Sequence, residues 1–172
     1  MSSPEPEPTL VEMVEHLETT HHVYLGEALP RLSALASRVA GSRAEEHPEL
    51  VEVERLVEEL RADLEPHLFK EEHVLFPMIR ELAGAASAPQ FHCGTLRNPI
   101  TVMGVEHDRA AELLDTLRTT TGGYEVPADG DEEHRTLYEG LEELEADTRV
   151  HMHKENDLLF PAVLEAEQAL GG

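Results

Sequence analysis

The sequence predicts an all-α protein folded as an up-down-up-down four-helix bundle. Apolar residues recur at the three-to-four spacing of helices, and no segment shows a sustained alternation of β-branched residues. Breaks rich in glycine and proline divide the 172 residues into four long helical segments. Short connections between such segments make neighbouring helices antiparallel. A pair of helical hairpins that dimerises into a bundle is the alternative architecture.

The first helix is predicted over residues 10–39. Thr9 is a good N-cap, and Glu12 stands three residues later as its capping-box partner. Pro30 interrupts the helical pattern, so we expect a bend near that residue. A short linker over residues 40–46, which contains a Gly-Ser pair, ends this first segment.

The second helix is predicted from Pro48, a good first helical residue, to Leu82. Pro66 and Pro77 lie inside it, and we expect each to kink the helix or to shift its hydrogen bonds locally. A connection over residues 84–98, rich in Ala, Gly, Ser and Pro, then leads to the third helix.

The third helix is predicted over residues 99–120, because Gly122 and Gly123 end the helical pattern. The fourth helix is predicted over residues 131–170, with a late kink at Pro161. The loop between these two helices carries further turn residues, so the fourth helix runs antiparallel to the third.

Composition limits the class of protein. Acidic residues outnumber basic ones 36 to 13, a net charge of −23, which disfavours binding to nucleic acid or to an anionic membrane. The single cysteine, Cys93, excludes an internal disulfide and a zinc site built on cysteines. No signal peptide or membrane-spanning segment is recognisable, so a cytoplasmic location is predicted. We predict a disordered tail over residues 1–8 and one bundle domain over residues 9–172.

The pattern H-x-x-K-E-x-x-x-L-F-P occurs twice, beginning at His67 and at His151. In each copy a histidine precedes a glutamate by four residues, so His67 shares a helix face with Glu71, and His151 with Glu155. An imidazole beside a carboxylate suits a metal ion of hard to borderline character. The repeat therefore predicts a metal site to which both halves of the chain contribute.

Two further histidines extend this duplication. His22 and His107 are 85 residues apart, close to the 84 residues that separate the two repeats. The rise of antiparallel helices from their connection brings His22 and His67 to nearly the same height in the bundle. Six metal ligands are therefore predicted: His22, His67, Glu71, His107, His151 and Glu155.

Four imidazoles and two carboxylates are too many for one metal ion of common geometry. They suit two ions in the core of the bundle, with Glu71 and Glu155 bridging and two imidazoles on each ion. Nitrogen and oxygen ligands with open positions favour iron over manganese and zinc. Gly26 and Ala111 each follow a lone histidine by four residues. Either they leave room for the bridging carboxylates, or they only let the helices approach closely.

Other polar residues near these positions have simpler interpretations. Asp63 and Asp147, four residues before the histidines of the repeat, either accept hydrogen bonds from the imidazoles or are plain surface carboxylates. Glu106 is a candidate for proton or ion traffic. Surface exposure is predicted for four of the remaining histidines: His16, His21, His92 and His134.

From about Leu10 to Ala166 the sequence resembles the hemerythrin-like (HHE cation-binding) family. Within that family it is most similar to the di-iron proteins that repair iron–sulfur clusters. The segments that carry the resemblance are H-H-V-Y-L-G-E-A-L-P-R-L at 21–32, H-P-E-L at 47–50, H-L-F-K-E-E at 67–72, C-G-T-L-R-N-P-I at 93–100, E-H-D at 106–108 and H-M-H-K-E-N at 151–156.

The resemblance implies two iron ions in a non-haem centre with oxo and carboxylate bridges. It implies redox chemistry, in which the centre binds oxygen, nitric oxide or peroxide, or releases iron to damaged iron–sulfur proteins. Cluster repair under nitrosative or oxidative stress is the leading hypothesis. A sensor or store for oxygen or nitric oxide is the second, and an enzyme that consumes peroxide or nitric oxide is the third.

The sequence departs from the family's pattern in three places. Oxygen-carrying hemerythrins use five histidines, and we identify four. Arg43 stands where the repair branch often has a histidine, and His47, ~30 Å along the helix from His67, is not counted as a ligand. Repair proteins commonly carry an N-terminal module with paired cysteines, whereas this sequence starts directly at the di-iron domain.

Overall fold

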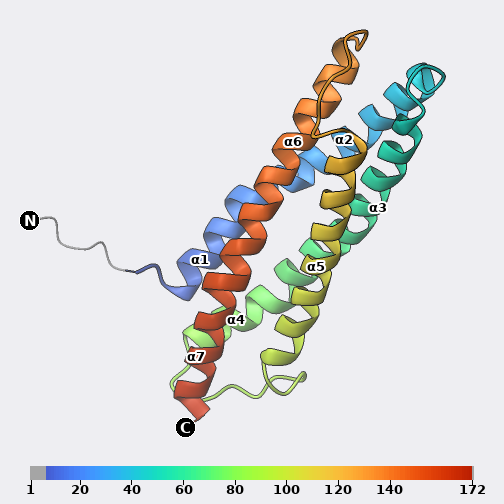
Figure 1. Ribbon diagram of the computed structural model, residues 1–172. Coiled ribbons are helices and arrows are strands. Elements are labelled where there is room, and N and C mark those ends of the chain that lie inside the picture. Colours follow the sequence, from blue (N-terminus) through green and yellow to red (C-terminus); the bar gives the residue numbers. More distant parts are fainter. Residues whose placement is uncertain (1–6, 172) are drawn as a thin grey trace, which may run out of the picture.

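The computed structural model describes residues 7–171, which are helical over most of their length (Figure 1). Four long helical segments form a bundle, which confirms the predicted fold class, and no β-strand occurs in this range. The elements, with η for a π-helix, are α1 Leu10–His16, η1 Leu17–His22, α2 Val23–Arg43, α3 Glu49–Lys70, η2 Glu71–Leu75, α4 Phe76–Ala83, α5 Arg97–Thr120, α6 Glu132–His153, η3 Lys154–Leu159 and α7 Phe160–Gly171.

Local sequence explains where two of these segments begin. The Thr9 hydroxyl accepts the backbone N–H of Glu12 at 3.2 Å, and the Glu12 carboxylate accepts that of Thr9 at 2.7 Å, so the predicted capping box is confirmed. Asp131 caps α6 by accepting the backbone N–H of His134 at 2.9 Å. Most of the predicted tail, residues 1–6, lies outside the described residues.

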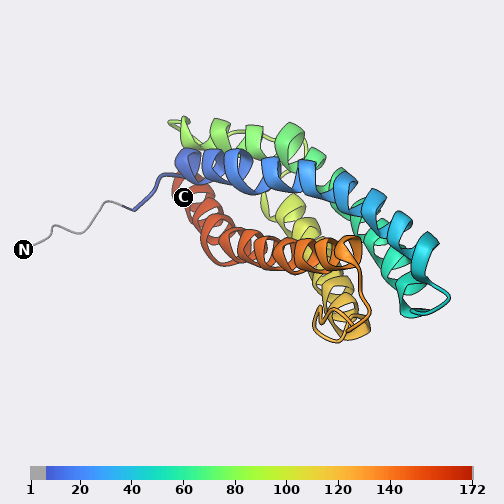
Figure 2. The ribbon, with the colours of Figure 1, turned by 90° about the horizontal axis from the view of Figure 1, so that it is seen from above.

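The first helical segment packs against two of the others. Helix α2 contacts both α3 and α6, and α3 contacts α5. Figure 2 shows the α1–α2 segment between α3–α4 on one side and α6–α7 on the other. Helices α1, α4 and α7 meet at the end of the bundle where the C-terminus lies. No helix within residues 7–171 is both long and apolar enough to cross a membrane.

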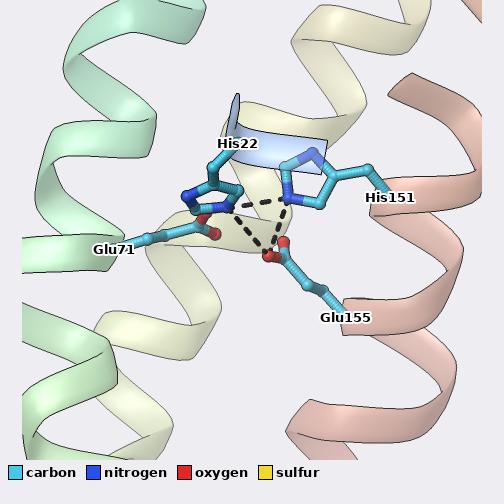
Figure 3. A group of neighbouring side chains, drawn as sticks. All are labelled: His22, Glu71, His151 and Glu155. Carbon is cyan, nitrogen blue, oxygen red and sulfur yellow. Dashed lines mark hydrogen bonds and ion pairs between the residues drawn. The ribbon is translucent and has the colours of Figure 1, made fainter. Parts of the chain in front are cut away.

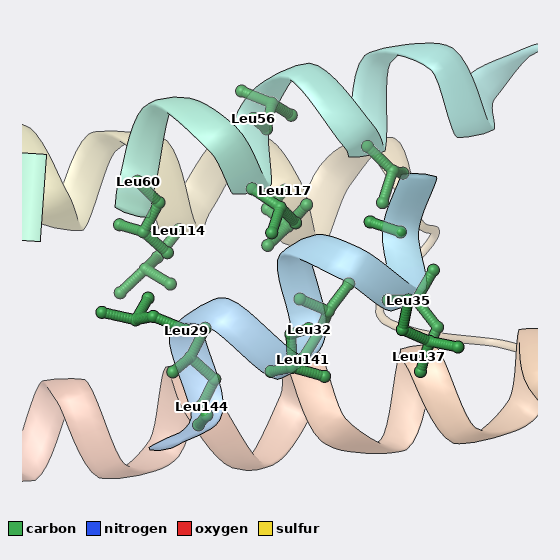
Figure 4. Packing of buried hydrophobic residues seen from close by; sticks show 14 of the residues in the cluster. Leu29, Leu32, Leu35, Leu56, Leu60, Leu114, Leu117, Leu137, Leu141 and Leu144 are labelled. Carbon is green, nitrogen blue, oxygen red and sulfur yellow. The ribbon is translucent and has the colours of Figure 1, made fainter. Parts of the chain in front are cut away.

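Buried apolar side chains form two clusters, one toward each end of the bundle. The larger cluster is rich in leucine, and Leu29, Leu60 and Leu141 bring three helical segments together in it (Figure 4). The smaller cluster includes Phe76 and Leu159 from the two L-F-P repeats. In each segment the predicted ligands fall between residues of the two clusters, so apolar layers enclose the polar centre on both sides.

Three π-helical turns interrupt the helices, a feature that we did not predict. In such a turn a backbone N–H bonds to the carbonyl five residues earlier, as Phe76 does with Glu71. Pro77 follows and has no N–H to continue the ladder, so the predicted local shift of hydrogen bonds is confirmed there. The second L-F-P repeat has the same arrangement. Pro66, in contrast, lies inside the unbroken helix α3.

Candidate metal centre

Six buried side chains meet in the middle of the bundle, and they are the six predicted ligands. Each π turn supplies one of them, and helices α3, α5 and α6 supply the others. The π turns carry His22, Glu71 and Glu155, and the α-helices carry His67, His107 and His151. Both carboxylates are fully buried. Because π turns often occur at functional sites, their position beside these six residues also indicates a functional site.

One half of the centre consists of His22, Glu71, His151 and Glu155, whose ligand atoms all lie within 4.8 Å of one another (Figure 3). Nε2 of His22 lies 3.1 Å from Oε2 of Glu71. Nε2 of His151 lies 2.8 Å from Oε1 of Glu155. Two nitrogen and two oxygen atoms from three helical segments therefore surround one point.

The other half consists of His67, Glu71, His107 and Glu155, again with all ligand atoms within 4.8 Å. Nε2 of His67 lies 3.1 Å from Oε1 of Glu71, and Nε2 of His107 lies 3.0 Å from Oε2 of Glu155. Both glutamates thus belong to both halves and direct one oxygen atom to each. This arrangement suits two cations that share the carboxylates, each with two imidazoles of its own.

Several buried atoms of the centre have no hydrogen-bond partner within the described residues. They are Nε2 of His22, both carboxylate oxygens of Glu71 and Oε2 of Glu155. Some lie at ion-pair distance from each other, as His22 does from Glu71, but not in hydrogen-bonding geometry. Burying such groups without partners is costly, and two bound cations would satisfy all four atoms. The residues present therefore fit a binuclear metal site.

Protons balance the charge of these residues when no cation is bound. Burial lowers the pKa of His22, but the nearby carboxylates of Glu155 and Glu71 outweigh it and raise that pKa to about 10. Burial also lowers the pKa of His67, but the nearby carboxylate of Glu71 outweighs it and raises that pKa to about 9. Burial favours a raised pKa for Glu155, but the charge of His151 holds it well below its usual range. Binding of cations must therefore release protons from the imidazoles.

The outer ring nitrogens of three ligand histidines meet acceptors on neighbouring segments. The Nδ1 contacts are His67 with Glu106 at 2.7 Å, His22 with Glu72 at 2.9 Å and His107 with the side-chain oxygen of Asn156 at 2.8 Å. Such contacts fix the tautomer that presents Nε2 to a metal ion. His151 differs, because its buried Nδ1 has no partner within residues 7–171.

A comparison with known protein families agrees with this geometry. The Hemerythrin HHE cation binding domain matches residues 13–163. The chain belongs to the hemerythrin HHE family. Its two overlapping groups of buried histidine and glutamate are suited to a binuclear metal site in such a cation-binding domain.

Several relatives of this hemerythrin-like chain bear names of repair proteins. It is 35% identical over 153 residues to the "Probable iron-sulfur cluster repair protein" of Haemophilus influenzae, covering 89% of this chain and 65% of that protein. It is 34% identical over 159 residues to the "Iron-sulfur cluster repair protein YtfE" of Cronobacter sakazakii, covering 92% and 68%. A protein of the same name from Escherichia coli is 32% identical over 158 residues, with the same coverage. The chain thus spans about two thirds of the length of these relatives.

Neither Asp63 nor Asp147 accepts a hydrogen bond from a ligand of this hemerythrin-like centre. Asp63 pairs with Arg109, and Asp147 lies 2.9 Å from Nδ1 of His21. The spacing argument considered one helix at a time, whereas the acceptors come from the neighbouring helices. Glu106, considered only for proton or ion traffic, is one of these acceptors.

The prediction that four further histidines are exposed is correct for two of them. His16 and His92 are exposed, but His21 and His134 are buried. The π turn η1 turns two consecutive histidines inward, and the ring of His21 stacks on that of His151 at 5.6 Å between centroids. The burial of His21 rests on this contact with a distant helix, which residue spacing alone does not reveal.

The small residues beside the lone histidines do not share one role. Gly26 is exposed, and a Cβ atom added to it would meet nothing within 4 Å, so it makes no room for the bridging carboxylates. Ala111 is half-buried and packs against the larger apolar cluster. At Gly26 the interpretation that linked small size to the metal site is wrong.

Arg43 and His47, which the comparison with the family singled out but which are not predicted ligands, lie at the end of the bundle away from the C-terminus. His47 lies 3.0 Å from the Asp129 carboxylate, and Arg43 pairs with Asp129 and Asp131. These contacts fasten the turn after α2 to the loop before α6. His47 is thus engaged away from the six predicted ligands, in agreement with its exclusion from the ligand set.

Proposed function

We propose that the chain is a non-haem di-iron protein of the cytoplasm that acts in iron–sulfur cluster repair or in the response to nitric oxide and oxidative stress. One observation carries the proposal: two groups of two imidazoles and two carboxylates, fully enclosed in the bundle, that share Glu71 and Glu155. Four nitrogen and oxygen ligands per ion leave positions free for a small molecule, a pattern that favours iron.

Iron bound here would supply redox chemistry toward oxygen, nitric oxide or peroxide. The side chains of the protein would hold and orient the ligands of the iron. Glu71 and Glu155 hold one oxygen in each half of the centre, and the contacts of Glu72, Glu106 and Asn156 keep three imidazoles in the tautomer that metal binding needs. The apolar clusters on both sides exclude bulk water from the site.

The repair role is supported by the names of the relatives and by their similarity over 89–92% of this chain. We therefore propose that damaged iron–sulfur proteins are also the partners of this chain. Nucleic acid and anionic membranes are not expected partners, because the net charge of −23 repels their phosphates.

Metal content together with the optical spectrum tests the di-iron centre. We expect about two iron ions per chain in the wild type and a loss of iron and of its absorption in His151→Ala. His153→Ala is the matched control, because His153 lies on the same helix, is exposed and, within residues 7–171, pairs only with Asp157. A wild type that binds only zinc, or no metal after anaerobic reconstitution with iron, would contradict the proposal.

Reactivation of an enzyme with a damaged iron–sulfur cluster tests the repair role separately. The iron-loaded protein should restore activity, and the metal-free protein should not. The free ligand positions also favour a second candidate, a sensor or store for oxygen or nitric oxide. A reversible spectral change on exposure to gas, without reactivation of the enzyme, would favour this candidate, and steady-state consumption of peroxide or nitric oxide would instead indicate an enzyme.

A further inference from the structure

A groove of about 510 Å³ runs over the surface between α1 and the η3–α7 segment. Met13 and Leu17 form one apolar wall, and Leu158, Pro161 and Ala162 form the other. Leu158 is a large apolar side chain that is 52% exposed, and it lies beside other apolar residues of the groove, so the exposed apolar surface is more than one scattered side chain. The groove is therefore a candidate surface for binding.

The walls follow the faces of two helical segments. Met13 and Leu17 lie where α1 meets η1, and Leu158 and Ala162 lie where η3 meets α7, so each wall belongs to one helical segment. The apolar strip thus runs lengthwise between two helices. Grooves of this kind accept a third helix whose apolar side chains repeat every three or four residues.

Acidic side chains line the same groove. Glu7, Glu12, Asp157 and Glu165 all border it and are all exposed. These four carboxylates face one lysine of the lining, Lys154, whose Nζ lies 2.6 Å from Nε2 of His16 and 2.9 Å from Nε2 of His21. The surface offered to a partner is therefore apolar in the middle and negative along its edges.

We propose that this groove is a docking site for a basic amphipathic segment of a partner protein, a stretch with an apolar face flanked by lysine or arginine. Such a segment would bury Leu158 and place its cations beside Asp157 and Glu165. The net charge of −23 attracts a basic partner from a distance. The same charge repels a second copy of this chain and an anionic membrane.

A partner in this groove would touch the segment that carries part of the metal centre. Lys154 lines the groove and directly precedes Glu155. His21, in contact with Lys154, stacks on the ring of His151. The docking proposal does not rest on a bound metal ion, so the two proposals can fail separately.

Fluorescence anisotropy with a defined peptide tests the site on the full-length chain. The probe is a labelled peptide of about 18 residues, five helical turns, with leucine on one face and lysine on the other. Leu158→Asp and Glu165→Lys should each weaken binding about tenfold or more, and added salt should weaken it further. Their matched controls, Val51→Asp and Glu139→Lys, change equally exposed helical residues outside the groove lining and should bind as the wild type does.

Two control peptides keep the result specific. A scrambled peptide of the same composition has no apolar face, and a peptide with glutamate in place of lysine has no positive charge; neither should bind. Equal binding of the scrambled peptide, or equal losses in the groove variants and their controls, would overturn the proposal. So would sedimentation of the chain with phosphatidylglycerol vesicles, or a dimer in solution that Leu158→Asp dissociates, since each would assign the groove to another occupant.

Discussion

Replacing Glu106 by Ala should weaken binding of the cation that lies between His67 and His107. The Glu106 carboxylate lies 2.7 Å from Nδ1 of His67 and orients the ring so that Nε2 points into the centre. Loss of such a partner costs 10- to 100-fold in metal affinity, or about 1.4–2.7 kcal/mol. Glu106 is 31% exposed and also pairs with Lys70, so solvent screens its charge, and we expect a loss of about tenfold.

Asp108→Ala is the matched control for this variant. Asp108 flanks His107 on the other side, is exposed and makes no side-chain hydrogen bond within the described residues. Anaerobic competition between the protein and a chromophoric iron(II) chelator measures both binding constants. One of the two should fall about tenfold in Glu106→Ala and neither in Asp108→Ala. Glu106→Gln should be intermediate, because its amide oxygen still accepts the N–H of His67.

Two outcomes would refute this reasoning. If Glu106→Ala binds iron as tightly as the wild type, the hydrogen bond to His67 does not hold the ligand in place. If Asp108→Ala loses as much affinity as Glu106→Ala, the effect comes from negative charge near the centre and not from orientation of the ring.

Three further predictions concern stability of the metal-free protein. Tyr124→Phe removes the 2.7 Å hydrogen bond to the buried Glu145 carboxylate and should cost about 1.5–3 kcal/mol in urea unfolding; a cost near zero would contradict this. Gly140→Ala places a Cβ atom 2.6 Å from a methyl group of the fully buried Leu32, and the overpacking should outweigh the gain in helix propensity by about 1 kcal/mol, seen as a lower Tm. Burial, and after it the nearby His47 and Arg43, lowers the pKa of His134 from 6.5, so the unfolded chain takes up this proton first as the pH falls. The stability that neutral His134 contributes is therefore full above pH 6.5 and declines as the pH falls below it. His134→Phe should flatten that part of the stability curve, and an unchanged slope would contradict the assignment.

The helices and the ligand residues could be predicted from the sequence because both depend on local spacing. A histidine four residues before a glutamate shares its helix face wherever that helix packs, and the repeat shows that this happens twice. The match of His22 with His107 depends only on counting residues. The predicted capping box of Thr9 and Glu12 is likewise local, because its two residues are three positions apart.

Contacts between helices could not be predicted in this way. The sequence indicated two imidazoles on each ion, but only the packed bundle pairs His22 with His151 and His67 with His107. These partners are 129 and 40 residues apart, and their approach depends on how each helix is rotated about its axis.

The π turns are a second feature that the sequence did not predict. They lie at the level of the centre: η1 carries His21 and His22, and η2 and η3 carry the carboxylates of Glu71 and Glu155. The sequence by itself therefore determined which residues form the centre. The tertiary structure decided which of them face one another and which acceptors hold them, because those contacts depend on helix rotation and packing, which residue spacing alone does not specify.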